Sequence, residues 1–255
     1  MRTRILLLLL VLAALPLVSS GAVIAVFGNN ATNTYLASLG HTVSQVTDAD
    51  LATPGFLDTF DLFYMTRVST GFGTGLSAGA AANVAAWLGG GRFVLLNADF
   101  ADGILYADAN VKQLTSNAVA WVLGGGSRGY IGEFNGAVSA LTSNSNGFTP
   151  IGIVSGSAGP LGWTQGGSDG TLWVVQPSHP VMAGLPASFN PDGIEFGSIV
   201  TGIDPALILA AFGPEGPLYP GVIAGGGAAG AIPEPSTFAL MAGGLALLLL
   251  RRRRQ

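Results

Sequence analysis

Polar side chains that could bind a ligand follow several apolar runs that are typical of strands. Asparagine, threonine, serine and arginine offer amide, hydroxyl and guanidinium groups to a sugar or an anion. The candidate crevice residues include one acid and one histidine beside these types, and they are Asn29, Asn30, Thr32, Arg67, Ser69, Asp99 and His179. The same residue types also suit turns, because asparagine tolerates left-handed backbone and threonine can cap a helix. The sequence therefore predicts a ligand crevice, with plain turn chemistry as the alternative.

No catalytic set is recognisable, and the sequence favours a protein that is not an enzyme. Cysteine is absent, which excludes a cysteine nucleophile, thiolate metal ligands and disulfides. Only His41 and His179 could act as imidazole bases or metal ligands. Asn97, Asp99, Asp102, Gly103 and Asp108 are expected in one loop as a small acidic cluster, but their spacing departs from that of a calcium loop. We expect no metal site and no cofactor.

The basic residues are concentrated at the two ends of the 255-residue chain. The net charge of −4 hides this segregation, because all 14 acidic residues lie between Asp48 and Glu234, where only four basic residues lie. An acidic body is repelled by phosphate backbones, so nucleic acid is excluded as a partner. Hydrophobic residues make up 49% of the chain, which predicts a sizeable core.

Residues 1–21 have the pattern of a secretory signal peptide. Arg2 and Arg4 precede an apolar run over 5–15, and small residues follow near 20–22. As a helix the run would span about 16 Å, which is too short for a stable membrane span. We therefore expect signal peptidase and the export machinery as partners.

Residues 232–255 have the pattern of a membrane anchor. An apolar run over 238–250 is followed directly by Arg251, Arg252, Arg253 and Arg254. A transmembrane helix of this length covers about 20 Å of a hydrocarbon core about 30 Å thick, and arginine side chains that reach to the interface cover part of the difference. Under the positive-inside rule both basic ends stay cytoplasmic, so the body between them lies outside the inner membrane.

Pro233, Glu234 and Pro235 precede this apolar run, and the three-part arrangement resembles the PEP-CTERM sorting signal. The resemblance implies that an exosortase, which is a membrane enzyme, recognises the tail and cuts it near these three residues. It also implies delivery to the cell surface or the extracellular matrix. The alternative is a plain single-span anchor in which the prolines only form a linker, and it gives the same topology.

The body over 22–220 is expected to be one α/β domain, and the glycine-rich segment 221–231 a flexible linker. Apolar runs predict strands and helices in alternation, with strands at 22–27, 41–46, 61–66 and 92–97 and helices at 32–39, 77–88 and 110–123. Less regular strands are expected at 130–141, 149–154, 171–175 and 207–212. The alternation is typical of a doubly wound, mostly parallel sheet. Such a sheet binds ligands outside the carboxyl ends of its strands, where most of the candidate crevice residues follow.

The segments 60–65, 87–96 and 178–186 resemble the class I glutamine amidotransferase-like superfamily and its ThuA-like relatives. The resemblance implies a flavodoxin-like sheet. It carries over no activity, because the amidotransferase nucleophile is a cysteine in the turn after a strand. The corresponding turn is expected at 97–99, in a chain without cysteine.

Two functions follow from these patterns. The leading prediction is an exported, surface-destined PEP-CTERM protein whose body is structural or binds extracellular polysaccharide. The alternative is an extracytoplasmic ThuA-like hydrolase that acts on carbohydrate, with His179 and Asp99 as its participants. A hydrogen bond between His179 and a carboxylate in the crevice would favour the hydrolase, and a His179 packed elsewhere would favour the other role.

Overall fold

The computed structural model describes residues 21–28, 30–68, 75–126, 128–140, 158–162, 170–192, 196–200 and 202–226. Residues 1–20 of the expected signal peptide, the apolar run 238–250 and the sorting residues from Pro233 to Arg254 lie outside these ranges. Within them, no helix is long and apolar enough to cross a membrane.

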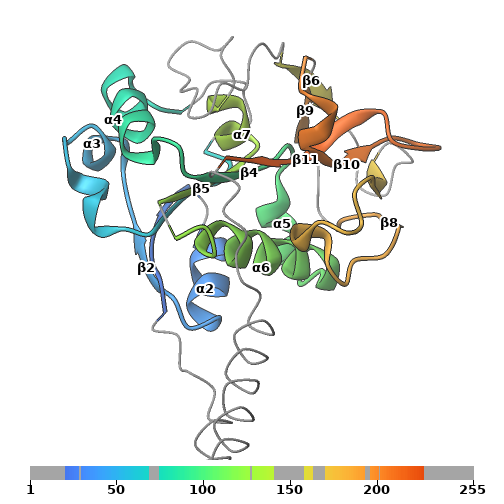
Figure 1. The fold of residues 1–255 in the computed structure, drawn as a ribbon, viewed down its shortest axis with the longest axis horizontal. Helices are drawn as coiled ribbons and strands as arrows, with labels where there is room; N and C mark the ends of the chain where they lie inside the picture. The colour runs from blue at the N-terminus through green and yellow to red at the C-terminus, as the bar shows by residue number, and fades with distance from the viewer. Residues whose placement is uncertain are drawn as a thin grey trace, which may run out of the picture.

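A mixed sheet with the strand order β2-β1-β3-β5-β4-β11-β10-β7-β8 forms the centre of the described part (Figure 1). Its parallel half consists of β2 (Thr42–Gln45), β1 (Val23–Phe27), β3 (Leu62–Met65), β5 (Gly129–Glu133) and β4 (Arg92–Leu96). Its antiparallel half consists of β11 (Tyr219–Gly225), β10 (Ile208–Phe212), β7 (Leu172–Val174) and β8 (Ser188–Phe189). A separate antiparallel pair joins β6 (Ala158–Gly162) to β9 (Phe196–Val200). The mixed α/β class with a mostly parallel central sheet is confirmed, whereas the flavodoxin-like assignment stays a prediction.

Helices cover both faces of the parallel half. On one face lie α2 (Asn30–Ser38), α5 (Phe100–Leu105) and α6 (Ala109–Leu123), and on the other lie α3 (Asp48–Leu51), α4 (Ala78–Leu88) and α7 (Asn135–Ser139) (Figure 1). Short 3-10 turns in the described part include η1 (Phe56–Thr59), η3 (Pro180–Met182) and η4 (Pro205–Leu207). Neighbouring strand residues alternate between the two layers, so Val26 packs in the α6 layer and Ala25 in the α4 layer. Burial on both faces explains why β1, β3 and β4 are largely continuous apolar runs.

The strand expected at 130–141 is wrong in its second half. β5 ends at Glu133, and the chain turns at Phe134 into the short helix α7. The segment 98–108, read as a loop, contains α5, and the Asp108 side chain caps α6 by accepting from the backbone N–H groups of Asn110 and Val111. The strand expected at 149–154 lies outside the described residues.

The linker expected to begin at residue 221 is also wrong at its start, because β11 continues to Gly225. Val222, Ile223 and Ala224 are 0%, 1% and 5% exposed between β4 and β10. Glycine serves packing here, since a Cβ at Gly225 would lie 2.7 Å from the Phe93 ring and one at Gly221 would lie 2.8 Å from the Phe212 ring. The body therefore extends past the expected boundary at 220.

Candidate functional site

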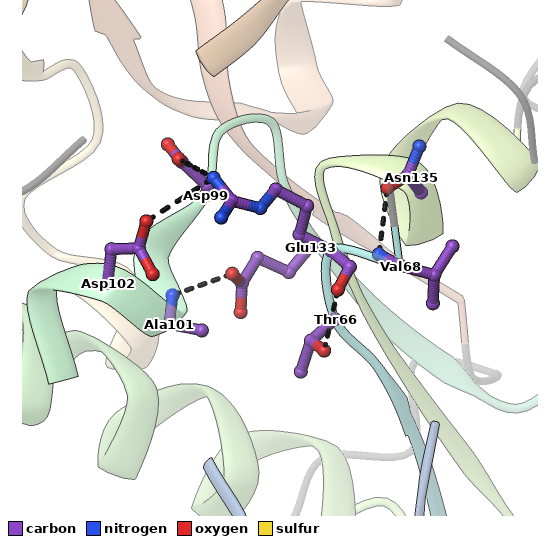
Figure 2. A network of polar contacts seen from close by, with 8 residues as sticks. Thr66, Val68, Asp99, Ala101, Asp102, Glu133 and Asn135 are labelled. Carbon is purple, nitrogen blue, oxygen red and sulfur yellow. Dashed lines mark hydrogen bonds and ion pairs between the residues drawn. The ribbon is translucent and has the colours of Figure 1, made fainter. Parts of the chain in front are cut away.

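The carboxyl ends of β1, β3, β5 and β4 meet at one edge of the sheet, which we call the carboxyl edge. Polar residues follow each strand there: Asn30 follows β1, Thr66 and Arg67 follow β3, Asn97 and Asp99 follow β4, and Asn135 follows β5. Asn135 Oδ1 accepts a hydrogen bond of 2.9 Å from the backbone N–H of Val68, which ties the β5–α7 turn to the segment after β3 (Figure 2). The parallel topology thus brings Arg67 and Asp99, two of the predicted crevice residues, to one place.

Arg67 is engaged by two carboxylates at this edge. Its Nη1 lies 2.7 Å from Asp99 Oδ2 and 3.3 Å from Asp102 Oδ2 (Figure 2). The Asp99 side chain is only 1% exposed, and that of Arg67 is 24% exposed. A buried carboxylate needs a charged or hydrogen-bonding partner, so Arg67 stabilises Asp99 in the folded state. Two acids around one guanidinium leave this cluster acidic, which disfavours an anionic ligand.

Glu133 is a buried acid beneath this cluster. It is the last residue of β5, is fully buried, and its Oε1 accepts a hydrogen bond of 2.6 Å from the backbone N–H of Ala101 (Figure 2). Burial raises its pKa well above the ordinary value, and the Asp99 and Asp102 charges raise it further, against the lowering effects of the Ala101 N–H and of Arg67. Within the described part, Glu133 Oε2 accepts no hydrogen bond. We therefore treat the carboxyl group as neutral.

The hydroxyl of Tyr64 completes the buried polar group. Burial raises its pKa well above the ordinary value, and the neighbouring Glu133 carboxyl contributes in the same direction. Tyr64 lies on β3, and Thr115, which also affects this pKa, lies on α6. All three side chains are fully buried, so this group sits in the core below the edge and outside any surface that a ligand could reach.

The turn between β5 and α7 has strained backbone. Phe134 has φ 43° and ψ −99°, a region that L-residues rarely adopt. Gly132 and Gly136 flank it closely: a Cβ at Gly132 would lie 2.6 Å from the Gly136 carbonyl carbon, and one at Gly136 would lie 2.3 Å from the Met65 carbonyl oxygen. A sharp strand-to-helix turn between two glycines is the geometry that exposes a nucleophile in α/β hydrolases.

Here the position of that nucleophile is occupied by Phe134, which is fully buried and has no nucleophilic atom. Sequence reasoning placed the corresponding turn at 97–99, where Asn97 Nδ2 donates to the Pro220 carbonyl oxygen at 2.8 Å and links β4 to β11. The spacing Gly132-x-Phe134-x-Gly136 was the signal that could have located the turn in the sequence.

Of the remaining predicted crevice residues, Asn30 and Thr32 lie on α2, which begins after the carboxyl end of β1. Asn30 is the exposed first residue of α2, and Thr32 on the same helix is fully buried. Asn29 and Ser69 lie outside the described residues. No group of three His, Asp or Glu side chains that could hold a metal ion occurs in the part of the chain that the structure covers.

His179 and Asp99 lie near opposite ends of the neighbouring strand β4, so they are far from each other. Its Nδ1 accepts from the backbone N–H of Val181 at 3.2 Å, and its ring packs against Trp121 with 5.1 Å between centroids. The Trp121 carbonyl oxygen accepts from Arg92, the first residue of β4, whereas Asp99 follows the other end of that strand. Burial lowers the His179 pKa, and Arg92 lowers it further. Among the described residues, His179 has no carboxylate partner.

Comparison with family models matched the PEP-CTERM protein-sorting motif over residues 231–254. No curated protein and no solved structure matched the chain. The resemblance to amidotransferase-like and ThuA-like domains therefore gains no support. The matched segment contains Pro233, Glu234, Pro235 and the terminal arginines, on which the predicted sorting signal rests. The chain carries a PEP-CTERM sorting motif, which marks it as an exported protein that an exosortase sorts.

Proposed function

We propose that an exosortase processes this protein near Pro233, Glu234 and Pro235 and that the body is delivered to the cell surface or the extracellular matrix. Before processing, residues 238–250 anchor the chain in the inner membrane, and the signal peptide has directed the body across it. The body has a non-catalytic role, either structural or in binding polysaccharide. The proposal rests on the sorting motif at 231–254.

The places of Gly21 and Gly226 in the sheet support an export segment before Gly21 and an anchor after Gly226. Gly21 lies at the amino end of the parallel strands, beside Gly40, whose carbonyl oxygen would lie 1.8 Å from an added Cβ. β11 runs antiparallel to β4, so Gly226 lies beside Gly91, also at the amino end. We call this side of the sheet the amino edge. Both connections leave there, so the carboxyl edge can point away from the membrane.

Three features of the body support a non-catalytic role. Phe134 occupies the strained turn that would otherwise present a nucleophile. Arg67 is engaged by Asp99 and Asp102. The hydrolase alternative requires His179 beside Asp99. His179 packs on Trp121 near the start of β4, whereas Asp99 follows the end of that strand.

The test of sorting uses tail variants in a host that contains the enzyme. We expect the wild-type chain to be shortened and recovered outside the cell. Replacement of Pro233, Glu234 and Pro235 by alanine should leave a full-length chain in the inner membrane. Replacement of Arg251–Arg254 by glutamine should impair retention or orientation, because the cytoplasmic charges hold the anchor.

An exosortase-deleted host is the control, and there the wild-type chain should behave like the alanine variant. A wild-type tail that stays uncut in the exosortase-containing host would refute the assignment. Shortening of the alanine variant to the same size as the wild type would show that these three residues are not the recognition element.

A further inference from the structure

A depression of about 290 Å³ lies at the amino edge on the α3–α4 side of the sheet. Its walls come from the segment after α3, from η1, from the end of α4 and from the residue before β5. Phe56, Leu57 and Trp87 supply apolar surface, and Asp58, Asn83 and Arg128 supply polar groups. The volume is close to the lower end of the range for small-molecule sites. A ligand there would be no larger than one or two sugar rings.

Arg128 is held in place although it is exposed. Its Nη2 lies 2.9 Å from Asp58 Oδ1, its Nη1 donates to the Trp87 carbonyl oxygen at 3.3 Å, and its guanidinium carbon lies 5.7 Å over the Trp87 ring. The side chains of Arg128 and Asp58 are 42% and 58% exposed. Exposed ion pairs contribute little to stability, because solvent screens them and ordering two side chains costs entropy. The ordered ion pair therefore adds little to the stability of the fold, and it presents its polar groups to a ligand in a fixed position.

The polar groups keep unused capacity. A guanidinium group has five N–H donors, of which these contacts use two. Asp58 Oδ2 accepts no hydrogen bond from the described residues. Asn83 donates to the Leu51 carbonyl oxygen at 3.0 Å, and within the same described part its own Oδ1 also accepts none. Donors and acceptors thus line the depression together with the apolar ring of Phe56.

The charges at the depression balance, which decides the class of ligand. Arg128 and Asp58 neutralise one another, so a charged ligand gains little net attraction. Adjacent hydroxyl groups can each donate to a carboxylate or amide oxygen and accept from a guanidinium N–H. The C–H face of a sugar ring can cover an aromatic side chain. We propose that this depression binds a neutral sugar unit of a polysaccharide, an inference that rests on the polysaccharide-binding role proposed above.

The test is a binding titration with the full chain in detergent micelles, followed by tryptophan fluorescence. The probes are two neutral tetrasaccharides, cellotetraose and chitotetraose, and one sulfated tetrasaccharide from heparin. We expect the neutral probes to bind and the sulfated one not to bind. Arg128→Gln and Asp58→Asn should each weaken binding about 10- to 100-fold, the value of a lost hydrogen bond to a charged group.

Lys112→Gln is the matched control, because Lys112 also lies over an aromatic ring, that of Tyr35 at 5.9 Å, but on the α6 side. It should leave binding unchanged. Thermal melts by circular dichroism verify that each variant is folded.

Each other outcome overturns the inference. If neutral probes bind Arg128→Gln and Asp58→Asn as tightly as the wild type, the sugar site lies elsewhere, and the polysaccharide-binding role survives. Binding of only the sulfated probe would assign an anion site. If nothing binds while tail processing proceeds normally, the sugar site and the binding role both fall, and the sorting proposal stands.

Discussion

Replacing Glu133 by glutamine should remove a loss of stability that the wild-type protein suffers as the pH rises. The carboxyl group is fully buried, and this burial raises its pKa well above the ordinary value of 4.5. In the unfolded chain the same group ionises near its ordinary pKa. Between the unfolded and the folded pKa the native state keeps a proton that the unfolded state has lost. The free energy of unfolding therefore falls by about 1.4 kcal/mol for each pH unit in this window.

Glutamine isolates this contribution, because it keeps the shape of the neutral acid and cannot ionise. Its amide oxygen can still accept from the Ala101 N–H, which Glu133 Oε1 accepts at 2.6 Å. The assay is urea denaturation of the full chain in detergent micelles, followed by circular dichroism at about pH 5, 6 and 7. Relative to Glu133→Gln, the wild type should lose about 1.4 kcal/mol per unit until the folded pKa is reached.

The matched control is Glu215→Gln, the same chemical change at an exposed carboxyl group between β10 and β11. A difference between the wild type and Glu133→Gln that stays constant with pH would refute the reasoning. A wild type that gains stability over the variant as the pH rises would show that Arg67 holds Glu133 ionised.

Two further predictions concern the sheet and the ion cluster. A chain truncated after Gly226 should fold and resist limited proteolysis, whereas a chain truncated after Gly221 should be cleaved. The shorter chain loses Val222 and Ile223, whose burial contributes about 3 to 6 kcal/mol to stability. Equal resistance of the two fragments to the protease would contradict the place of β11 in the core. Arg67→Met should lower the free energy of unfolding in urea by about 2 to 4 kcal/mol, because Asp99 is left buried without the guanidinium group. Adding Asp99→Asn to this variant should recover part of the loss. Strictly additive effects of the two substitutions would contradict the ion pair.

The central parallel strands β1, β3 and β4 were predictable from the sequence because they are buried on both faces. The runs expected at 22–27 and 92–97 correspond to β1 (Val23–Phe27) and β4 (Arg92–Leu96). The helix expected at 110–123 is α6 (Ala109–Leu123), whose inward face carries Val111, Leu114 and Ala118. Each run ends at a glycine or a polar turn, so both the period and the boundaries could be read from the sequence.

β11 was not predictable from local pattern, because glycine has two uses in this chain. Gly221 and Gly225 look like linker residues, yet each makes room for an aromatic ring of a neighbouring strand. Those rings belong to Phe212 and Phe93, and the Phe93 ring lies more than a hundred positions from Gly225 in the sequence. The periodicity of a local segment cannot predict a contact with a residue so distant in the sequence.

The candidate site was predictable only as a location. The sheet topology brings Arg67 to Asp99, but no local signal indicated that Asp102 would share the arginine. Nor did any signal indicate that Glu133, at the end of an apolar strand, would be buried and would accept from Ala101, 32 positions away. These outcomes depend on how α5 packs beside β5.

The place of β11 sets a limit on where the tail can be cut. β11 pairs with both β4 and β10, so it joins the parallel half of the sheet to the antiparallel half. A cut within β11 would remove part of a buried strand from the middle of the sheet and leave backbone groups of β4 and β10 unpaired. Pro233 lies seven positions beyond Gly226, so processing at the sorting motif leaves every residue of β11 in place. The body can then leave the membrane with its core intact, as the proposed delivery to the cell surface requires.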